Sequence, residues 1–416
     1  MHHNKIRIPL EQQLGNELFE TLEGEILLDI MAEGRVDGMS FDYHQMLQGH
    51  SFKASPELAP GLFGVFQEVK ETLEFEEPID FYINNSPELN AFAIASLEGD
   101  KPHIVNLNSG LVHMLTDREL RFVVGHEIGH IISRNANITN LIQFVFPPNR
   151  YIPALLQHKI NLWQKLSELT ADRYGFIACN DIASCISGFF KIACGLNSDR
   201  VQFNYQAYFE ENERVLAMFR ESGAGNALSH PINPVRIKAI ELFASSQLFK
   251  SLSDEGEPPI DEQLNLAIDE LNLALMVLSS NPLDLYRKQF VATGGIIMSG
   301  LDEDMSADEL EAILQTLSNF TIFPQQYLET VLNSGKVVEL FNEAISNILE
   351  INPGDRFVMF DMLVSIAHSD HRITKPEIAF LFEIGTKTFG MSRKEVAQMI
   401  AQNVQNGFNP ELYGSG

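Results

Sequence analysis

The stretch from Thr116 to Arg134, TDRELRFVVGHEIGHIISR, constrains this chain most. Thr116 and Glu119 have the spacing of a capping box, which predicts that a helix begins here. Large aliphatic residues follow at positions that would leave this helix mostly buried: Leu120, Val123, Val124, Ile128, Ile131 and Ile132. We therefore expect a core helix rather than a surface one.

Two histidines on this helix are spaced to share one metal ion. His126 and His130 lie four residues apart, so both project from one face, one turn apart. Glu127 lies beside the first histidine, where it would polarise a metal-bound water rather than bind the metal. The expected ion is one Zn²⁺ per chain, whose bound water has a pKa of about 7 and is a usable nucleophile. The alternative is an ordinary helix with two histidines, one of them packed in a core.

A catalytic zinc site predicts a third ligand downstream, on another helix. The segment from Ser167 to Cys179, SELTADRYGFIAC, offers Glu168 and Asp172 at i and i+4 on one helical face. Glu168 would complete a His₂Glu ligand set and leave a fourth position open for water. Asp172 would accept a hydrogen bond from a ligand histidine and so fix its tautomer. Acidic pairs on helices usually face solvent, but the flanking residues here are apolar.

Four segments resemble those of a known protein group and follow one another along the chain in the same order as in that group. HEIGH followed by SELTADRYGF is similar to the HtpX and CAAX-prenyl-endopeptidase group of gluzincin zinc metallopeptidases, whose pattern is HExxH with a later ExxxD. The other two similar segments are Asn90-Ala91-Phe92-Ala93 and Ser229-His230-Pro231, the latter followed by Arg236. The resemblance covers about Pro56 to Ser246. It implies a zinc-dependent endopeptidase that hydrolyses peptide bonds of protein or peptide substrates.

The resemblance also implies roles for residues outside the zinc motif. Asn90 to Ala93 would form the substrate-facing segment at an edge strand. His230 would stabilise the oxyanion of the tetrahedral intermediate, a role that needs a donor about 3 Å from that oxygen. The alternative for His230 is a loop histidine that holds a turn. Arg236 would orient Asp172 or His230.

Composition limits the class of protein and its partners. The chain has 29 basic and 56 acidic residues and a net charge of −27, so its surface should be strongly negative. Such a surface argues against nucleic acid and anionic membranes as partners. Neither a signal peptide nor an apolar run of about 18 residues is found, which predicts a soluble cytoplasmic protein without a transmembrane segment. This departs from membrane-embedded members of the resembled group and argues against prenylated or membrane substrates.

The expected fold class is α+β: a mainly helical zincin-type peptidase domain with a small β-sheet, followed by an all-α domain. A chain of 416 residues has room for two or three domains. The expected parts are an N-terminal helical segment (1–54), the zinc metallopeptidase domain (55–250), an acidic linker with a connecting helix (251–282) and an all-α accessory domain (283–416). Strands are expected over Pro78–Ile83, Asn90–Ser96 and His103–Leu107. The sheet edge would bind an extended substrate by strand addition.

The remaining segments are mostly expected to be helical. Single helices are expected over Leu10–Met31, Pro56–Leu73, Val235–Phe249, Ile260–Ser279, Leu310–Leu317 and Ile378–Phe389. Asn135–Gln164 should form a helix, a break at Pro147-Pro148 and a second helix. This segment is either a lid or wall of the substrate cleft or a hairpin packed on the core. The three cysteines, Cys179, Cys185 and Cys194, lack a CxxC spacing and are expected to be reduced thiols.

A weak internal repeat marks the C-terminal third. Asp302–Glu309 and Asp370–Glu377 share the pattern D-x-x-[MI]-[ST]-x-x-E, and two capping boxes, Ser306/Glu309 and Thr374/Glu377, explain most of it. The region from about Leu283 to Phe408 also resembles the TerB-like helical domain of tellurite resistance. That resemblance implies an interaction or sensing module with a protein partner, and weak cation binding at Asp302, Asp304 and Asp370. The ligand and glycine spacing excludes an EF-hand.

The C-terminal third supports an alternative to the peptidase. The chain would then be a latent or non-proteolytic zinc-containing interaction or sensor protein that acts through its C-terminal helical domain. An open cleft beside Asn90–Ser96 would favour the protease, whereas a site plugged by Asn135–Gln164 would favour the latent protein.

Overall fold

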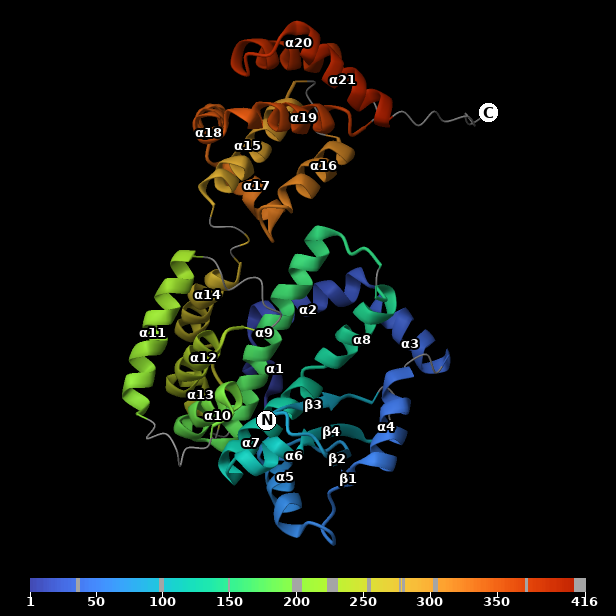
Figure 1. Ribbon diagram of the computed structural model, residues 1–416, viewed down its shortest axis with the longest axis vertical. Coiled ribbons are helices and arrows are strands. Elements are labelled where there is room, and N and C mark those ends of the chain that lie inside the picture. Colours follow the sequence, from blue (N-terminus) through green and yellow to red (C-terminus); the bar gives the residue numbers. More distant parts are fainter. Residues whose placement is uncertain are drawn as a thin grey trace. The chain divides into compact units, whose positions relative to one another are not determined.

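The computed structural model divides the chain into two compact units, Met1–Leu275 and Met276–Gly416. It describes residues 1–34, 38–96, 101–148, 150–196, 204–222, 231–252, 256–276, 278, 281–301, 306–370 and 373–407. Both units are mostly helical, and the first also holds a four-stranded sheet (Figure 1). The expected α+β class with an all-α C-terminal region is confirmed. The four-part division of the chain stays a prediction.

Two helices form the centre of the first unit: α7 (Asp117–Ile132) and α9 (Ala154–Cys179). The expected capping box is present, because Thr116 accepts from the Glu119 N–H while the Glu119 carboxylate accepts from the Thr116 N–H at 2.7 Å. Glycines let the two backbones touch. A Cβ on Gly125 would lie 2.6 Å from Cβ of Ala178, too close for any larger residue. Their close packing brings the polar side chains of both helices together.

The sheet lies beside α7 and has the strand order β1-β2-β4-β3. Its strands are β1 (Phe52–Lys53), β2 (Ile79–Asn84), β3 (Ala91–Ile94) and β4 (His103–Asn108). β2 and β4 run parallel, while β1 and β3 run antiparallel to their neighbours. β4 is buried throughout, as a central strand should be. The three expected strands are confirmed, β1 was missed because it has only two residues, and β3 lies at the edge next to α7.

The N-terminal segment is part of the first unit and packs on α9. Its helices are α1 (His3–Ile6), α2 (Pro9–Thr21), α3 (Gly24–Gly34) and α4 (Gly38–His50). The single helix expected over Leu10–Met31 was wrong, since the left-handed φ of +50° at Glu23 separates α2 from α3. On α9, Thr170 accepts a hydrogen bond from the Ile8 N–H and Arg173 donates to the Ile6 carbonyl at 2.7 Å.

Further helices of the first unit surround this centre. They are α5 (Pro60–Thr72), α6 (Ser109–Met114), α8 (Asn135–Val145), α10 (Ile182–Cys194), α11 (Tyr205–Ser222), α12 (Asn233–Ser245), α13 (Gln247–Ser251) and α14 (Glu262–Met276). The expected helix, break and helix are confirmed as α8 and α9. The single helix expected over Val235–Phe249 was wrong, because Ser246 takes an extended conformation and caps α13 instead. No helix among the described residues is long and apolar enough to cross a bilayer.

The second unit is helical throughout its described residues. It contains α15 (Pro282–Ser299), α16 (Ala307–Leu317), α17 (Pro324–Asn333), α18 (Val337–Ile351), a 3₁₀ turn (Pro353–Asp355), α19 (Arg356–Ala367), α20 (Lys375–Glu383), a π-helical turn (Ile384–Thr388) and α21 (Arg393–Gly407). Both expected capping boxes are present, at Ser306/Glu309 and Thr374/Glu377. Asp302 and Asp304 lie outside the described residues. The TerB-like resemblance and any cation site there stay predictions.

A buried ion pair supports the start of α7. Lys191 of α10 donates to the Glu119 carboxylate at 2.8 Å, and both side chains are less than 5% exposed (3% and 4%). Burial alone would raise the pKa of Glu119, but hydrogen bonds from Lys191, Ser187 and the Thr116 backbone lower it overall. Glu119 is therefore charged at neutral pH and depends on Lys191 for compensation.

Lys191→Met should destabilise the first unit by about 3–5 kcal/mol, because it leaves a buried carboxylate without its cation. Trp163, the only tryptophan of the chain, lies in the first unit, so its fluorescence during urea unfolding follows this unit. The difference in stability between wild type and variant should shrink on acidification. Because the pKa of Glu119 is lower in the folded protein than in the unfolded chain, its charge stabilises the fold above the unfolded pKa, and this stabilisation is lost as pH falls through the folded pKa.

Lys53→Met provides the matched control. Lys53 pairs with Asp80 in the same unit, but its side chain is half exposed (51%). Its loss should cost no more than about 1 kcal/mol. Equal losses in the two variants would contradict a special role for the buried pair.

Candidate metal centre

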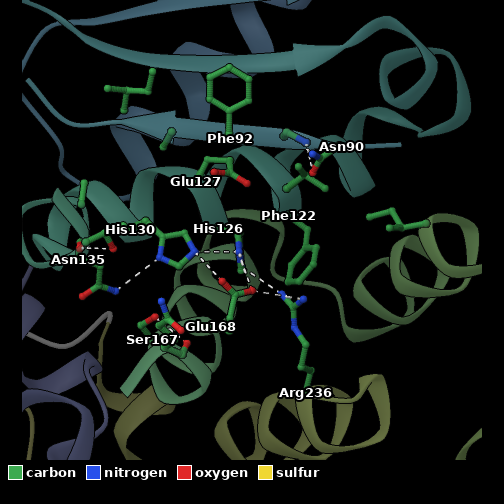
Figure 2. A pocket seen from close by; sticks show the side chains of 18 of the residues that line it. Asn90, Phe92, Phe122, His126, Glu127, His130, Asn135, Ser167, Glu168 and Arg236 are labelled. Atoms are coloured by element: carbon green, nitrogen blue, oxygen red, sulfur yellow. Dashed lines mark hydrogen bonds and ion pairs between the residues drawn. The ribbon is translucent and has the colours of Figure 1, made fainter. Parts of the chain in front are cut away.

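Three elements supply the polar side chains of the site. α7 carries His126, Glu127 and His130, and α9 carries Glu168 (Figure 2). Arg236 comes from the first turns of α12. The i, i+4 spacing of the histidines and the close contact of α7 with α9 place these groups around one point. The sequence-predicted ligand residues therefore come together.

The ligand atoms of the three expected residues lie close enough together to hold one ion, all within 4.8 Å of one another. Nε2 of His126 and Nε2 of His130 lie 3.2 Å apart. Oε2 of Glu168 lies 3.6 Å from the first of these atoms, and Oε1 lies 3.3 Å from the second. Ligands about 2.0–2.1 Å from a tetrahedral zinc are about 3.3–3.4 Å from one another. The donor set thus fits Zn²⁺ in chemistry and in spacing, with one side left open.

A buried carboxylate orients the first histidine. Asp172 is fully buried and lies 2.9 Å from Nδ1 of His126. A neutral His126 that donates its Nδ1–H to Asp172 keeps the lone pair of Nε2 for a metal. Asp172 in turn accepts two hydrogen bonds from Arg236, at 2.6 and 2.8 Å. Of the two partners expected for Arg236, the structure shows Asp172.

The same contacts settle the charges in this buried cluster. Burial by itself would raise the pKa of Asp172, but the Arg236 charge and hydrogen bonds from Arg236 and His126 lower it overall. Burial would lower the pKa of Arg236, and its carboxylate neighbours raise it overall. The guanidinium also lies over the ring of Phe189, 4.8 Å from its centroid. Both groups therefore stay ionised at neutral pH.

Glu127 occupies a different environment from Glu168. Figure 2 shows it between Phe92 of β3 and the two histidines. Burial raises the pKa of Glu127, and the nearby His126 and His130 oppose only part of this effect. A carboxylate with a raised pKa accepts a proton more readily than a solvated one.

The site opens into a pocket of about 690 Å³. Its walls come from β3, α7, α8, α9, α10 and α12, and the four residues Asn90 to Ala93 all line it. One set of lining residues is apolar: Leu89, Phe92, Ile94, Leu111, Phe122, Val123, Phe189 and Ile192. Side chains of α8 and early α9 add a polar wall: Asn135, Thr139, Asn140, Gln143 and Gln164. Of the two interpretations of Asn135–Gln164, the geometry favours a wall of the cleft.

β3 presents backbone groups at the edge of the sheet. The Asn108 N–H donates to the Asn90 carbonyl at 3.0 Å, and Phe92 pairs with Asn106 two residues on. Because antiparallel ladders alternate, the backbone groups of Ala91 and Ala93 point away from β4. The Ala91 N–H is taken by the Asn90 side chain at 3.0 Å. The Ala93 N–H is thus the group placed to receive a partner strand.

One expected site residue is not described by the structure, and one residue at the site was not expected from the sequence. His230, the expected oxyanion donor, lies outside the described residues. Asn135 was not expected to belong to the site, yet it is buried and its amide lies 3.5 Å from Nδ1 of His130. The signal available in the sequence was an amide residue five positions after the second histidine.

Comparisons with known proteins agree with this geometry. Residues 62–157 match the model of Peptidase family M48. This segment is therefore similar to that family. The match includes His126, Glu127 and His130 and ends before Glu168. The HtpX-like assignment within the family stays a prediction.

Two curated proteins are similar to parts of the chain. Plastoglobule-localized metallopeptidase 48, chloroplastic, of Arabidopsis thaliana is 30% identical over 218 residues, 49% of this chain and 62% of that protein. Metalloprotease LoiP of Escherichia coli (strain K12) is 34% identical over 55 residues, 13% of this chain and 19% of that protein. The chain thus spans less than two thirds of either relative. No solved structure matches significantly.

Asp172→Asn should weaken zinc binding by about 10–100-fold, because the amide holds the His126 imidazole less firmly and lowers its basicity. Competition with a coloured zinc chelator measures the dissociation constant, and Trp163 fluorescence checks that the unit is folded. Glu11→Gln is the matched control: Glu11 is another fully buried carboxylate beside α9, bonded to Arg7 and Thr170. Equal zinc affinities of wild type and Asp172→Asn would contradict the orienting role.

Proposed function

We propose that this chain is a zinc-dependent metalloendopeptidase that hydrolyses peptide bonds of protein substrates. The observation that carries the proposal is the clustering of the ligand atoms of His126, His130 and Glu168, within 4.8 Å of one another, in a pocket beside an edge strand. Zn²⁺ held by these atoms would supply a water of pKa about 7 and polarise the scissile carbonyl. The M48 match and the metallopeptidase names of both relatives support this reading.

Glu127 is the proposed general base and acid. It takes a proton from the attacking water and then gives it to the leaving amine. Its position between β3 and the histidines supports this role, because a metal-bound water and a peptide on the strand edge would both lie close to it. Burial raises the pKa of this carboxylate, which favours its acceptance of a proton from the water. Asp172 and Arg236 hold His126 in place, and His230 is proposed to stabilise the developing oxyanion.

β3 is the proposed binding strand for the substrate. An extended peptide would pair with the backbone groups of Ala91 and Ala93 and so pass the ligand atoms in the pocket. Strand addition recognises main chain, so sequence preference must come from side chains meeting the apolar and polar walls. A protein or peptide substrate with an unfolded segment fits this arrangement.

The pocket favours a protease over the latent alternative. A site plugged by α8 would have supported a non-proteolytic protein, but α8 forms one wall and leaves a pocket of about 690 Å³ beside β3. The second unit is proposed to act as an interaction module for a protein partner, in keeping with its TerB-like sequence pattern. A cytoplasmic location stays a prediction.

Glu127→Ala should keep zinc and lose turnover by about 10²–10⁴-fold, because the residue transfers protons without binding the metal. The assay measures zinc stoichiometry together with cleavage of casein for wild type and variant. Cleavage by the wild type should also stop when a chelator removes the metal.

The outcomes separate the two functions. One zinc in both proteins and no cleavage by either would support the latent protein. An absence of zinc from both would contradict the metal centre itself.

Ala93→Pro should raise KM about twofold to tenfold, because it removes one backbone donor worth about 0.5–1.5 kcal/mol. Proline is tolerated on edge strands, and Ala93 does not donate to the β3–β4 ladder. Ala93→Ser keeps the N–H and is the control, with KM expected near that of the wild type. The measurement is the concentration dependence of casein cleavage. The same KM for both variants would argue against strand addition.

A further inference from the structure

The two histidines differ at Nδ1: that of His126 lies against a carboxylate, and that of His130 has no carboxylate partner among the described residues. His126 has Asp172 on its Nδ1, whereas Nδ1 of His130 faces the side-chain amide of Asn135 at 3.5 Å. Figure 2 shows Asn135 directed at His130 from α8. Asn135 is almost fully buried (4% exposed) and lines the same pocket.

The chain makes a specific turn to place this amide. α7 ends at Ile132, and Arg134 takes a left-handed conformation with φ +56° and ψ +25°. This conformation is uncommon for a residue with a Cβ. It reverses the chain so that α8 begins at Asn135 and its side chain returns to His130. The turn therefore determines what Nδ1 of His130 meets.

The two ends of the Asn135 side-chain amide have different surroundings. Its nitrogen faces Nδ1 of His130, while its oxygen Oδ1 is buried and has no hydrogen-bond partner in the part of the chain that the structure describes. A histidine whose Nε2 lies among metal ligands carries its proton on Nδ1, which then needs an acceptor. Rotating the amide by 180° exchanges two ends of equal size and puts Oδ1 opposite that proton.

We propose that Asn135 is a positioning residue for the metal centre: its Oδ1 accepts the Nδ1–H of His130 and keeps the Nε2 lone pair of His130 for the ion. This inference rests on the proposed function, because it gives His130 a metal to bind. It assigns the two ligand histidines different partners, a carboxylate for His126 and a neutral amide for His130. A neutral acceptor leaves the ligand set less negative than two carboxylates would.

The test compares zinc dissociation constants of full-length variants by chelator competition, with Trp163 fluorescence as the check on folding. Asn135→Leu removes the acceptor at similar size and should weaken zinc binding by about 10–100-fold. Asn135→Asp restores an acceptor that cannot donate and should bind zinc at least as tightly as the wild type. Asn140→Asp adds the same charge to the same wall of the pocket, where no contact with His130 is seen among the described residues, and should leave the affinity near that of the wild type.

Four outcomes of this zinc-binding experiment would overturn the proposal. Weak binding by a folded Asn135→Asp would overturn the acceptor role, because it would show that the amide donates. Unchanged binding by Asn135→Leu would overturn any role for Asn135 in positioning while leaving the peptidase proposal intact, provided that the wild type binds one zinc and cleaves casein. An equal increase in zinc affinity in Asn135→Asp and Asn140→Asp would show that the added negative charge alone causes it, and this would also overturn the proposal. A wild type without zinc would overturn both proposals.

Discussion

The contact between α7 and α9 is the constraint on which the rest of the first unit depends. Gly125, Gly129 and Gly175 lie in this contact, and a Cβ on each would come within 3 Å of the opposite helix. Only at this separation can a glutamate side chain on α9 reach two histidines on α7, and Asp172 reach the far nitrogen of His126. The glycines weaken helix propensity by about 1 kcal/mol each, and the packing and polar contacts of the two helices offset this.

The helices around this contact bury charged side chains, and two of these are compensated by a partner of opposite charge. Glu119 of α7 has Lys191 of α10, and Asp172 of α9 has Arg236 of α12. Replacing one partner leaves an ion in a medium that solvates it poorly, which costs more than the pair contributes when intact. The ion pairs therefore constrain how the helices pack. Each pair can form only when its two helices are packed as they are here, and the same packing brings the ligand atoms together.

Local patterns in the sequence predicted the parts of the site that are one helix turn apart. The capping box at Thr116, the two histidines and the Glu168/Asp172 pair each follow from spacing along one helix. Features that depend on a reversal of the chain direction were missed, because the residues at these turns adopt a left-handed backbone conformation although they are not glycine. Glu23 divides one expected helix into two, and Arg134 brings Asn135 back to the site. His230 came only from resemblance, and its position stays outside the described residues.

The N-terminal residues make contacts that composition could not predict. α9 presents Glu168 and Asp172 to the metal centre, and the neighbouring Thr170 and Arg173 bond the backbone of Ile8 and Ile6. Burial lowers the pKa of Arg173 to about 10, so it remains a cation at neutral pH and needs the carbonyl it binds. One helix thus joins the chain's first residues to Glu168 of the candidate metal centre, through contacts more than 160 residues apart in sequence. No local signal encodes such a contact, although it fixes the rotation of α9 and hence the direction of Glu168.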